Sequence, residues 1–172
     1  MILAIIQARL TSTRLPNKIY EKINGKRMID MVLDATIGSK VDGIVVAAPH
    51  DLDVKVPVFI GSEDDVLDRY YRCAEKFGAD AVVRITADCP LIDRSIIDYA
   101  IDYYHKNTYP YVIFAPVDGL DVEVFSMDIL KEAWESTSDK SDREHVTPYM
   151  KRKTKISVDT REDLERVIYE LA

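Results

Sequence analysis

The chain has 172 residues, of which 47% are hydrophobic, and its formal net charge is -7. This length and composition are typical of one globular domain with one sizeable core, which we expect to span residues 1–172. The acidic balance argues against a general nucleic-acid-binding protein, which would need a basic surface to neutralise phosphates.

Cysteine usage and hydropathy indicate where the protein works. Cys73 and Cys89 are the only cysteines and do not form a CxxC pair, so the sequence suggests neither a disulfide framework nor a zinc knuckle. The opening MILAIIQARL has too short an apolar segment for a signal peptide and runs straight into charge. No later run approaches the ~20 apolar residues of a membrane span. We therefore expect a cytoplasmic protein with neither a nucleic-acid nor a membrane partner.

The first half of the chain alternates strands with helices. Continuous apolar runs at 2–7, 43–48, 56–60 and 81–86 are typical of strands buried on both faces of a largely parallel sheet. Apolar residues at helical spacing predict helices over 28–37 and 64–77, and Gly78 is placed to end the second one.

The second half continues with a mixture of elements. We expect helices at 95–105, 127–134 and 144–151, extended segments at 111–115 and 122–125, a strand at 155–158 and a last helix from Arg161. The predicted fold class is therefore α/β: a mostly parallel mixed sheet flanked by helices, with an α+β character in the second half.

A basic loop, QARLTSTRLPNK at residues 7–18, leaves the first strand. In open α/β sheets this position is a usual place for phosphates, although the chain has neither GxxxxGK[ST] nor GxGxxG. Arg9, Arg14 and Lys18 supply charged donors that suit a triphosphate. The alternative is a solvated surface loop whose charges pair with nearby carboxylates.

Two carboxylates are candidates for a metal. Asp88, in RITADCP, directly follows a predicted strand, although an Asp there is also a common turn former. Asp159, in SVDTREDLE, is equally suited to cap a helix. Mg²⁺ commonly takes one or two carboxylates together with water and substrate phosphates, so both roles stay open.

These segments together resemble a known family. IIQARLTSTRLPNK, GSEDDVLDRY, RITADCPLID, GLDVEVFS and REHVTPY resemble the spore coat polysaccharide biosynthesis protein F family, which is related to the CMP-KDO and CMP-acylneuraminate synthetases. The resemblance covers almost the whole chain. It implies a single-domain, GT-A-like (Rossmann-like) nucleotidyltransferase that transfers CMP from CTP to a sugar or acidic sugar, with Mg²⁺, and releases pyrophosphate.

The resemblance also assigns roles residue by residue. It implies that the CTP phosphates and nucleoside are held by Ala8, Arg9, Ser12, Arg14 and Lys18, and that Mg²⁺ is bound by Asp88 and Asp159. The segment near the base would contain Ser62 and Asp65. The residues that face the sugar would be Asp121, Glu123, Glu144 and His145. Arg9, Arg14, Lys18 and Asp88 would act in catalysis.

The chain departs from the family pattern in two places. The signature loop reads Thr11-Ser12-Thr13-Arg14 where a glycine is usual at its start, and Asn17 stands where glycine is common. The chain is also shorter than full members between about 150 and 155, a region that would help build an acceptor pocket or a dimer contact.

Other functions stay open at this point. Asp51-Leu52-Asp53 fits the D-x-D motif of a GT-A glycosyltransferase, and a shortened chain could be a non-catalytic nucleotide-binding module. His145 could be a general base or a hydrogen-bonded structural residue. The tyrosines at 99, 103, 104, 109 and 111 suggest packing or a dimer patch rather than a platform for nucleic-acid bases, so a homodimer also stays open.

Overall fold

The structure is a computed structural model that describes residues 1–11 and 14–155. Ser12, Asp159, the expected helix from Arg161 and all but the first residue of the expected strand at 155–158 lie outside the described residues. The strands are β1 (Ile2–Gln7), β2 (Lys22–Ile23), β3 (Lys26–Arg27), β4 (Gly43–Ala48), β5 (Val58–Ile60), β6 (Ala81–Thr86), β7 (Tyr111–Phe114) and β8 (Val122–Ser126). The helices are η1 (Lys18–Tyr20, a 3-10 turn), α1 (Met28–Ile37), α2 (Val66–Phe77), α3 (Arg94–Lys106), α4 (Met127–Ser136), α5 (Lys140–His145) and α6 (Pro148–Lys153).

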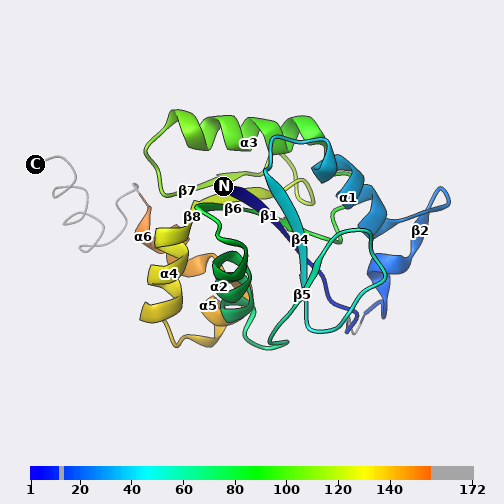
Figure 1. Cartoon of the computed structure of the whole chain (residues 1–172), viewed down its shortest axis with the longest axis horizontal. Coiled ribbons are helices and arrows are strands. Elements are labelled where there is room, and N and C mark those ends of the chain that lie inside the picture. The colour runs from blue at the N-terminus through cyan, green and yellow to red at the C-terminus, as the bar shows by residue number, and fades with distance from the viewer. Residues whose placement is uncertain (12–13, 156–172) are drawn as a thin grey trace, which may run out of the picture.

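Six strands form one mixed sheet in the order β5-β4-β1-β6-β8-β7 (Figure 1). Strand β1 lies parallel to β4 and β6, and β4 lies parallel to β5. Strand β8 runs antiparallel to both of its neighbours. This arrangement confirms the predicted α/β class with a mostly parallel mixed sheet.

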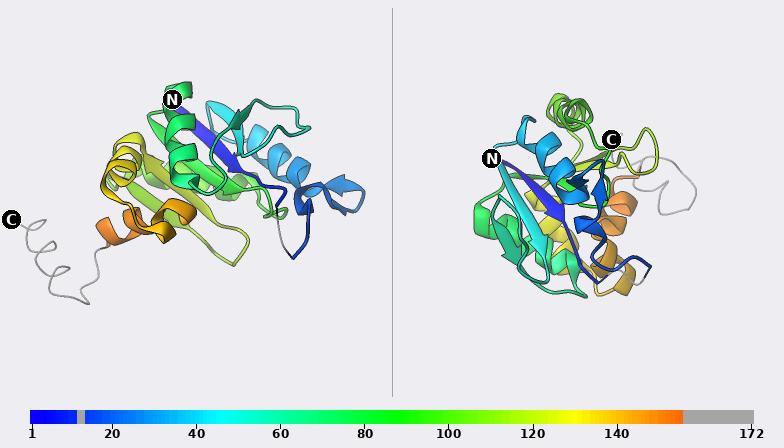
Figure 2. Two further views of the ribbon diagram at one scale, coloured as in Figure 1. Left: turned by 90° about the horizontal axis from the view of Figure 1, so that it is seen from below. Right: turned by 90° about the vertical axis from the view of Figure 1, so that its right-hand side faces the viewer.

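Helices cover both faces of this sheet, α1 and α3 on one side and α2 and α4 on the other (Figures 1 and 2). Side chains alternate along a strand, so β1 supplies Ile2, Ala4 and Ile6 to one core cluster and Leu3 and Ile5 to the other. None of these five residues is more than 8% exposed. Burial on both faces explains why the sequence of this strand is a continuous apolar run.

The helix expected over 144–151 is wrong. The chain instead forms α5 and α6, separated at Val146 and Thr147. Val146 has a φ of 71°, a conformation that a β-branched side chain rarely adopts, and Pro148 is the first residue of α6. Proline lacks the N–H that a helix interior needs, so the break lies where a new helix begins.

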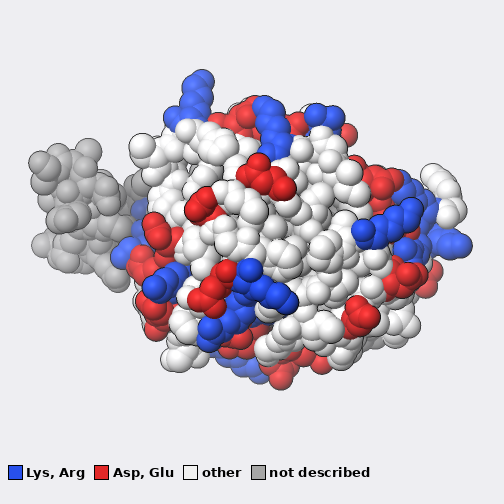
Figure 3. Space-filling view, viewed as in Figure 1, with Lys and Arg blue, Asp and Glu red and all other residues white. Residues whose placement is uncertain are grey.

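Charges are mixed over the surface. On the face drawn in Figure 3, acidic and basic side chains are interspersed and no continuous basic surface is visible. Within the part of the chain that the structure describes, no helix has the length and apolar character needed to cross a membrane.

Candidate active site

The predicted basic loop and Asp88 meet at the carboxyl edge of the central strands. Gln7 ends β1 and is paired with Thr86, which ends β6. The N–H of Ala8 donates to the Ala47 carbonyl at 3.1 Å, and the N–H of Ala87 donates to the Gln7 carbonyl at 2.9 Å. These bonds fix the starts of both loops on rigid strands, so the two loops leave the sheet side by side.

A small cavity of about 110 Å³ lies between these loops. It is lined by Gln7, Ala8, Arg9, Lys18, Ile19, Thr86, Ala87 and Asp88. Beside it the ammonium of Lys18, on η1, forms an ion pair with the Asp88 carboxylate. Burial works to raise the pKa of Asp88, but the hydrogen bonds from Lys18 and Thr86 and the Lys18 charge hold it below its usual value. The Asp88 carboxylate is therefore ionised at neutral pH.

A larger cavity of about 530 Å³ adjoins the small one, because Gln7 and Arg9 line both. It lies between the β1 loop, the loop that follows β5, and α5. Its lining residues are Gln7, Arg9, Thr11, Pro49, Glu63, Asp64, Val66, Arg69, Lys140, Glu144 and His145. Thr11 ties two walls together, since its hydroxyl donates to the Glu63 carboxylate at 2.6 Å. Arg9, Glu144 and His145 are thus three sequence-predicted residues that the fold brings to one cavity.

Arg69 lines the larger cavity although it is only 2% exposed, and it is not among the residues predicted from the sequence. One guanidinium nitrogen donates to the Ser62 carbonyl, while its Nε has no hydrogen-bond partner among the described residues. Burial lowers the pKa of Arg69 below its usual value. The sequence feature that could have indicated Arg69 is its position as a charged residue on the buried face of α2, beside Leu67 and Tyr70.

Ser62 and Asp65 lie at the start of α2 and line neither cavity. Asp65 caps this helix by accepting from the Asp68 N–H at 2.9 Å, and its own N–H donates to the Ser62 hydroxyl at 3.0 Å. Its second oxygen accepts from Nε of Arg143, on α5, at 3.0 Å. These contacts hold α5, and with it Glu144 and His145, against the larger cavity.

Of the residues predicted to face the sugar, Asp121 and Glu123 line neither cavity. Asp121 is half-buried at the start of β8 and accepts from the Gly119 N–H at 3.4 Å. Glu123 is 2% exposed and pairs with Arg84 of β6. Its carboxylate therefore faces the interior of the fold rather than either cavity.

The remaining candidates lie apart from the cavities or outside the described residues. Arg14 is exposed and lines neither cavity. The D-x-D segment is in the loop between β4 and β5, where Asp53 accepts from Arg27 at 3.0 Å and Leu52 is buried. Neither of its aspartates lines either cavity.

The residues that could hold a metal are few. Among residues 1–11 and 14–155, no group of three His, Cys, Asp or Glu side chains is placed to bind one. Of the two aspartates predicted to bind Mg²⁺, Asp88 is the one that the structure describes, and its carboxylate is paired with Lys18.

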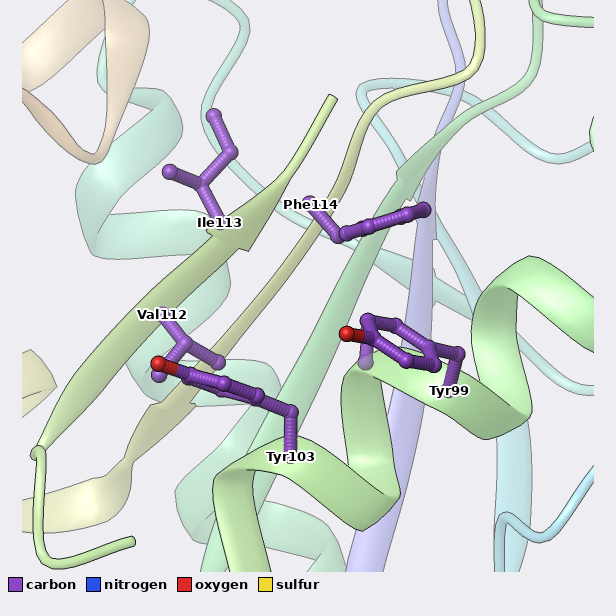
Figure 4. Close-up of a pocket in the computed structure, with 6 residues that line it drawn as sticks. Tyr99, Tyr103, Val112, Ile113 and Phe114 are labelled. Carbon is purple, nitrogen blue, oxygen red and sulfur yellow. The ribbon is translucent and has the colours of Figure 1, made fainter. Parts of the chain in front are cut away.

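A third cavity, of about 150 Å³, is apolar and lies between α3 and β7. Figure 4 shows the rings of Tyr99 and Phe114 next to each other in its wall, with Tyr103 beside Val112. The centroids of the first two rings are 4.7 Å apart. Among the described residues, no charged side chain lines this cavity.

Comparison with known proteins identifies the family. The family model described as cytidylyltransferase matches residues 3–169. This chain belongs to the cytidylyltransferase family. Among relatives, an uncharacterized protein of Methanocaldococcus jannaschii is 39% identical over 161 residues, covering 87% of this chain and 66% of its own length. The spore coat polysaccharide biosynthesis protein SpsF of Bacillus subtilis is 27% identical, covering 96% of this chain and 84% of its own.

A third relative is the 3-deoxy-manno-octulosonate cytidylyltransferase of Geobacter sulfurreducens. It is 33% identical over 62% of this chain, and the match spans 46% of its own length. The chain thus spans less than two thirds of the length of two of these three relatives. The resemblance to the spore coat family and the KDO synthetases is confirmed.

Solved structures agree on the fold. A cytidylyltransferase from Leptospira borgpetersenii has a TM-score of 0.80 at 28% identity, covering 95% of this chain and 83% of that one. A CMP:2-keto-3-deoxy-manno-octonic acid synthetase complexed with CTP has a TM-score of 0.67 at 17% identity, covering 99% of this chain and 98% of that one.

Proposed function

We propose that this chain is a Mg²⁺-dependent cytidylyltransferase that transfers CMP from CTP to a sugar or acidic sugar and releases pyrophosphate. The observation that carries the proposal is the meeting of Lys18 and Asp88 at the carboxyl edge of β1 and β6, beside a cavity of about 530 Å³. Crevices at this edge of open α/β sheets are where ligands bind. The family and the CTP complex of a structural neighbour support the choice of nucleotide.

The two cavities suit different parts of CTP. The larger one has the size of a nucleoside site and offers both donors and acceptors, among them Arg69 and Glu144. The smaller one presents Arg9 and Lys18, whose charges suit phosphate oxygens. The cytosine and ribose would occupy the larger cavity, and the phosphates would lie toward Lys18.

Lys18 and Asp88 act by position and charge in this scheme. An ammonium has three donors, so Lys18 can keep its contact with Asp88 while it also donates to a phosphate oxygen. Arg9 and Lys18 would stabilise the charge that builds on the departing pyrophosphate. Asp88 would hold Mg²⁺, which when bound neutralises phosphate charge and orients the attacking oxygen.

The proposal is tested by the nucleotide that stabilises the fold. A ligand that binds the native state stabilises it by an amount that grows with the logarithm of its affinity, so CTP with Mg²⁺ should raise the melting temperature more than equal concentrations of ATP, GTP or UTP do. Equal shifts from all four nucleotides would refute the assignment to cytidine.

A further inference from the structure

Gln7 occupies the point where the two cavities meet. It is the last residue of β1 and, among the described residues, it lines both cavities together with Arg9. A nucleotide whose nucleoside fills one cavity and whose terminal phosphates fill the other must pass this point. The atom group that joins these two parts is the α-phosphate, where the proposed transfer takes place.

The side chain of Gln7 is held by Arg84. Nη2 of Arg84, on the neighbouring strand β6, donates to Oε1 of Gln7 at 3.1 Å. Guanidinium nitrogens only donate, so the amide oxygen must face Arg84. The NH₂ group of Gln7 is then the end that remains for another partner, and no described residue accepts from it.

Arg84 is itself fixed by a buried network. Its Nη1 forms an ion pair with Glu123, and its guanidinium lies 5.9 Å from the centre of the Tyr70 ring. Glu123 also accepts from the Tyr111 hydroxyl at 2.7 Å and the Thr147 hydroxyl at 2.9 Å. A buried carboxylate with several partners has one favourable position, so it determines where Arg84 and then Gln7 can lie.

We propose that Gln7 is a ligand-binding residue whose NH₂ donates to a non-bridging oxygen of the nucleotide α-phosphate, with Arg84 as its positioning residue. This inference rests on the proposed function. It also gives Glu123 a role: the carboxylate acts on the nucleotide through Arg84 and Gln7, without touching the sugar.

The test is the dependence of affinity on the number of phosphates. Gln7→Glu keeps the length of the side chain and an oxygen for Arg84, but it replaces the donor with a negative charge. Titrations with cytidine, CMP and CTP should show unchanged affinity for cytidine and at least about tenfold weaker binding of CMP and CTP. Asn107→Asp is the matched control, because it makes the same change at the far end of α3 and should bind all three normally.

Arg84→Lys tests the positioning role separately. Lysine keeps the charge near Glu123 but loses the planar guanidinium, whose two terminal nitrogens contact Glu123 and Gln7. It should weaken binding of CMP and CTP while leaving cytidine unaffected, whereas a merely structural defect would weaken all three ligands. Wild-type affinity for CMP in Gln7→Glu, or an equal loss for cytidine in either variant, would overturn the inference alone. Absence of all binding by the unmodified chain would instead refute the proposed function.

Discussion

Lys18→Met tests whether the Lys18–Asp88 pair serves the ligand or the fold. The side chains of Lys18 and Asp88 are 24% and 39% exposed, so solvent screens the pair. Pairs of this kind contribute about 0.2 to 1 kcal/mol to stability, and the free energy of unfolding should fall by no more than that. A charged hydrogen bond to phosphate contributes about 1.5 to 3 kcal/mol, so CTP binding should weaken roughly ten- to hundredfold.

Calorimetric titration with CTP and Mg²⁺, together with urea unfolding without ligand, measures the two quantities independently. Lys40→Met is the matched control. It removes the same charge and a similar exposed ion pair, with Asp102, and Lys40 lines neither of the two candidate cavities. Unchanged CTP affinity in Lys18→Met would contradict the phosphate role, and a stability loss well above 1 kcal/mol would show that the pair is mainly structural.

Three further predictions concern other parts of the molecule. Asp65→Ala removes a helix cap and the partner of Arg143, so urea unfolding should show a loss of about 1 to 2 kcal/mol, and an unchanged midpoint would contradict the capping role. Burial works to raise the pKa of Glu123, but the charges of Arg84 and Lys151 hold it below its usual 4.5. The ionised carboxylate therefore stabilises the fold above about pH 4.5, and this stabilisation is lost as the pH falls through the pKa that Glu123 has in the folded protein. Glu123→Gln should therefore lower stability at pH 7 by about 3 to 5 kcal/mol and flatten its decline in acid, and a parallel decline would contradict this. Burial raises the pKa of the Cys73 thiol to about 12, so a thiol reagent should modify Cys89 first, and equal rates would contradict this.

The central strands could be predicted from the sequence because strands buried on both faces need apolar side chains at nearly every position. Strands β1, β4 and β6 have the predicted bounds, since each is covered by helices on both faces and so consists of a continuous apolar run. Strand β5 begins at Val58 rather than at the expected residue 56. Pro57 has no N–H to donate, which makes it a poor member of a strand interior.

Some local features were missed although their signals are short and readable. The β2–β3 hairpin turns at Asn24 and Gly25, which both have positive φ and form a preferred two-residue hairpin sequence. Pro148 marked the start of a new helix within a segment that was expected to be one helix. Asn17 has a φ of 55°, which explains why asparagine can replace the glycine common at this position.

Only part of the candidate site could be predicted from the sequence. The basic loop and Asp88 could each be placed after a strand of a mostly parallel sheet, and the pairing of β1 with β6 in the structure brings them together. The Gln7–Arg84–Glu123 network could not be predicted, since its members are 77 and 39 positions apart and no local pattern joins them. Only the placement of antiparallel β8 beside β6 brings Glu123 to Arg84.

The central claim is most directly tested by pyrophosphate release from CTP in the presence of Mg²⁺ and a panel of 2-keto acid sugars. We expect pyrophosphate to appear only when CTP and an accepted sugar are both present, and to be strongly reduced in Asp88→Asn. Release of a nucleoside diphosphate from a nucleoside diphosphate sugar, with no pyrophosphate from CTP, would indicate a glycosyltransferase, and CTP binding without any release would indicate a non-catalytic nucleotide-binding module. Either result would contradict the proposed cytidylyltransferase activity.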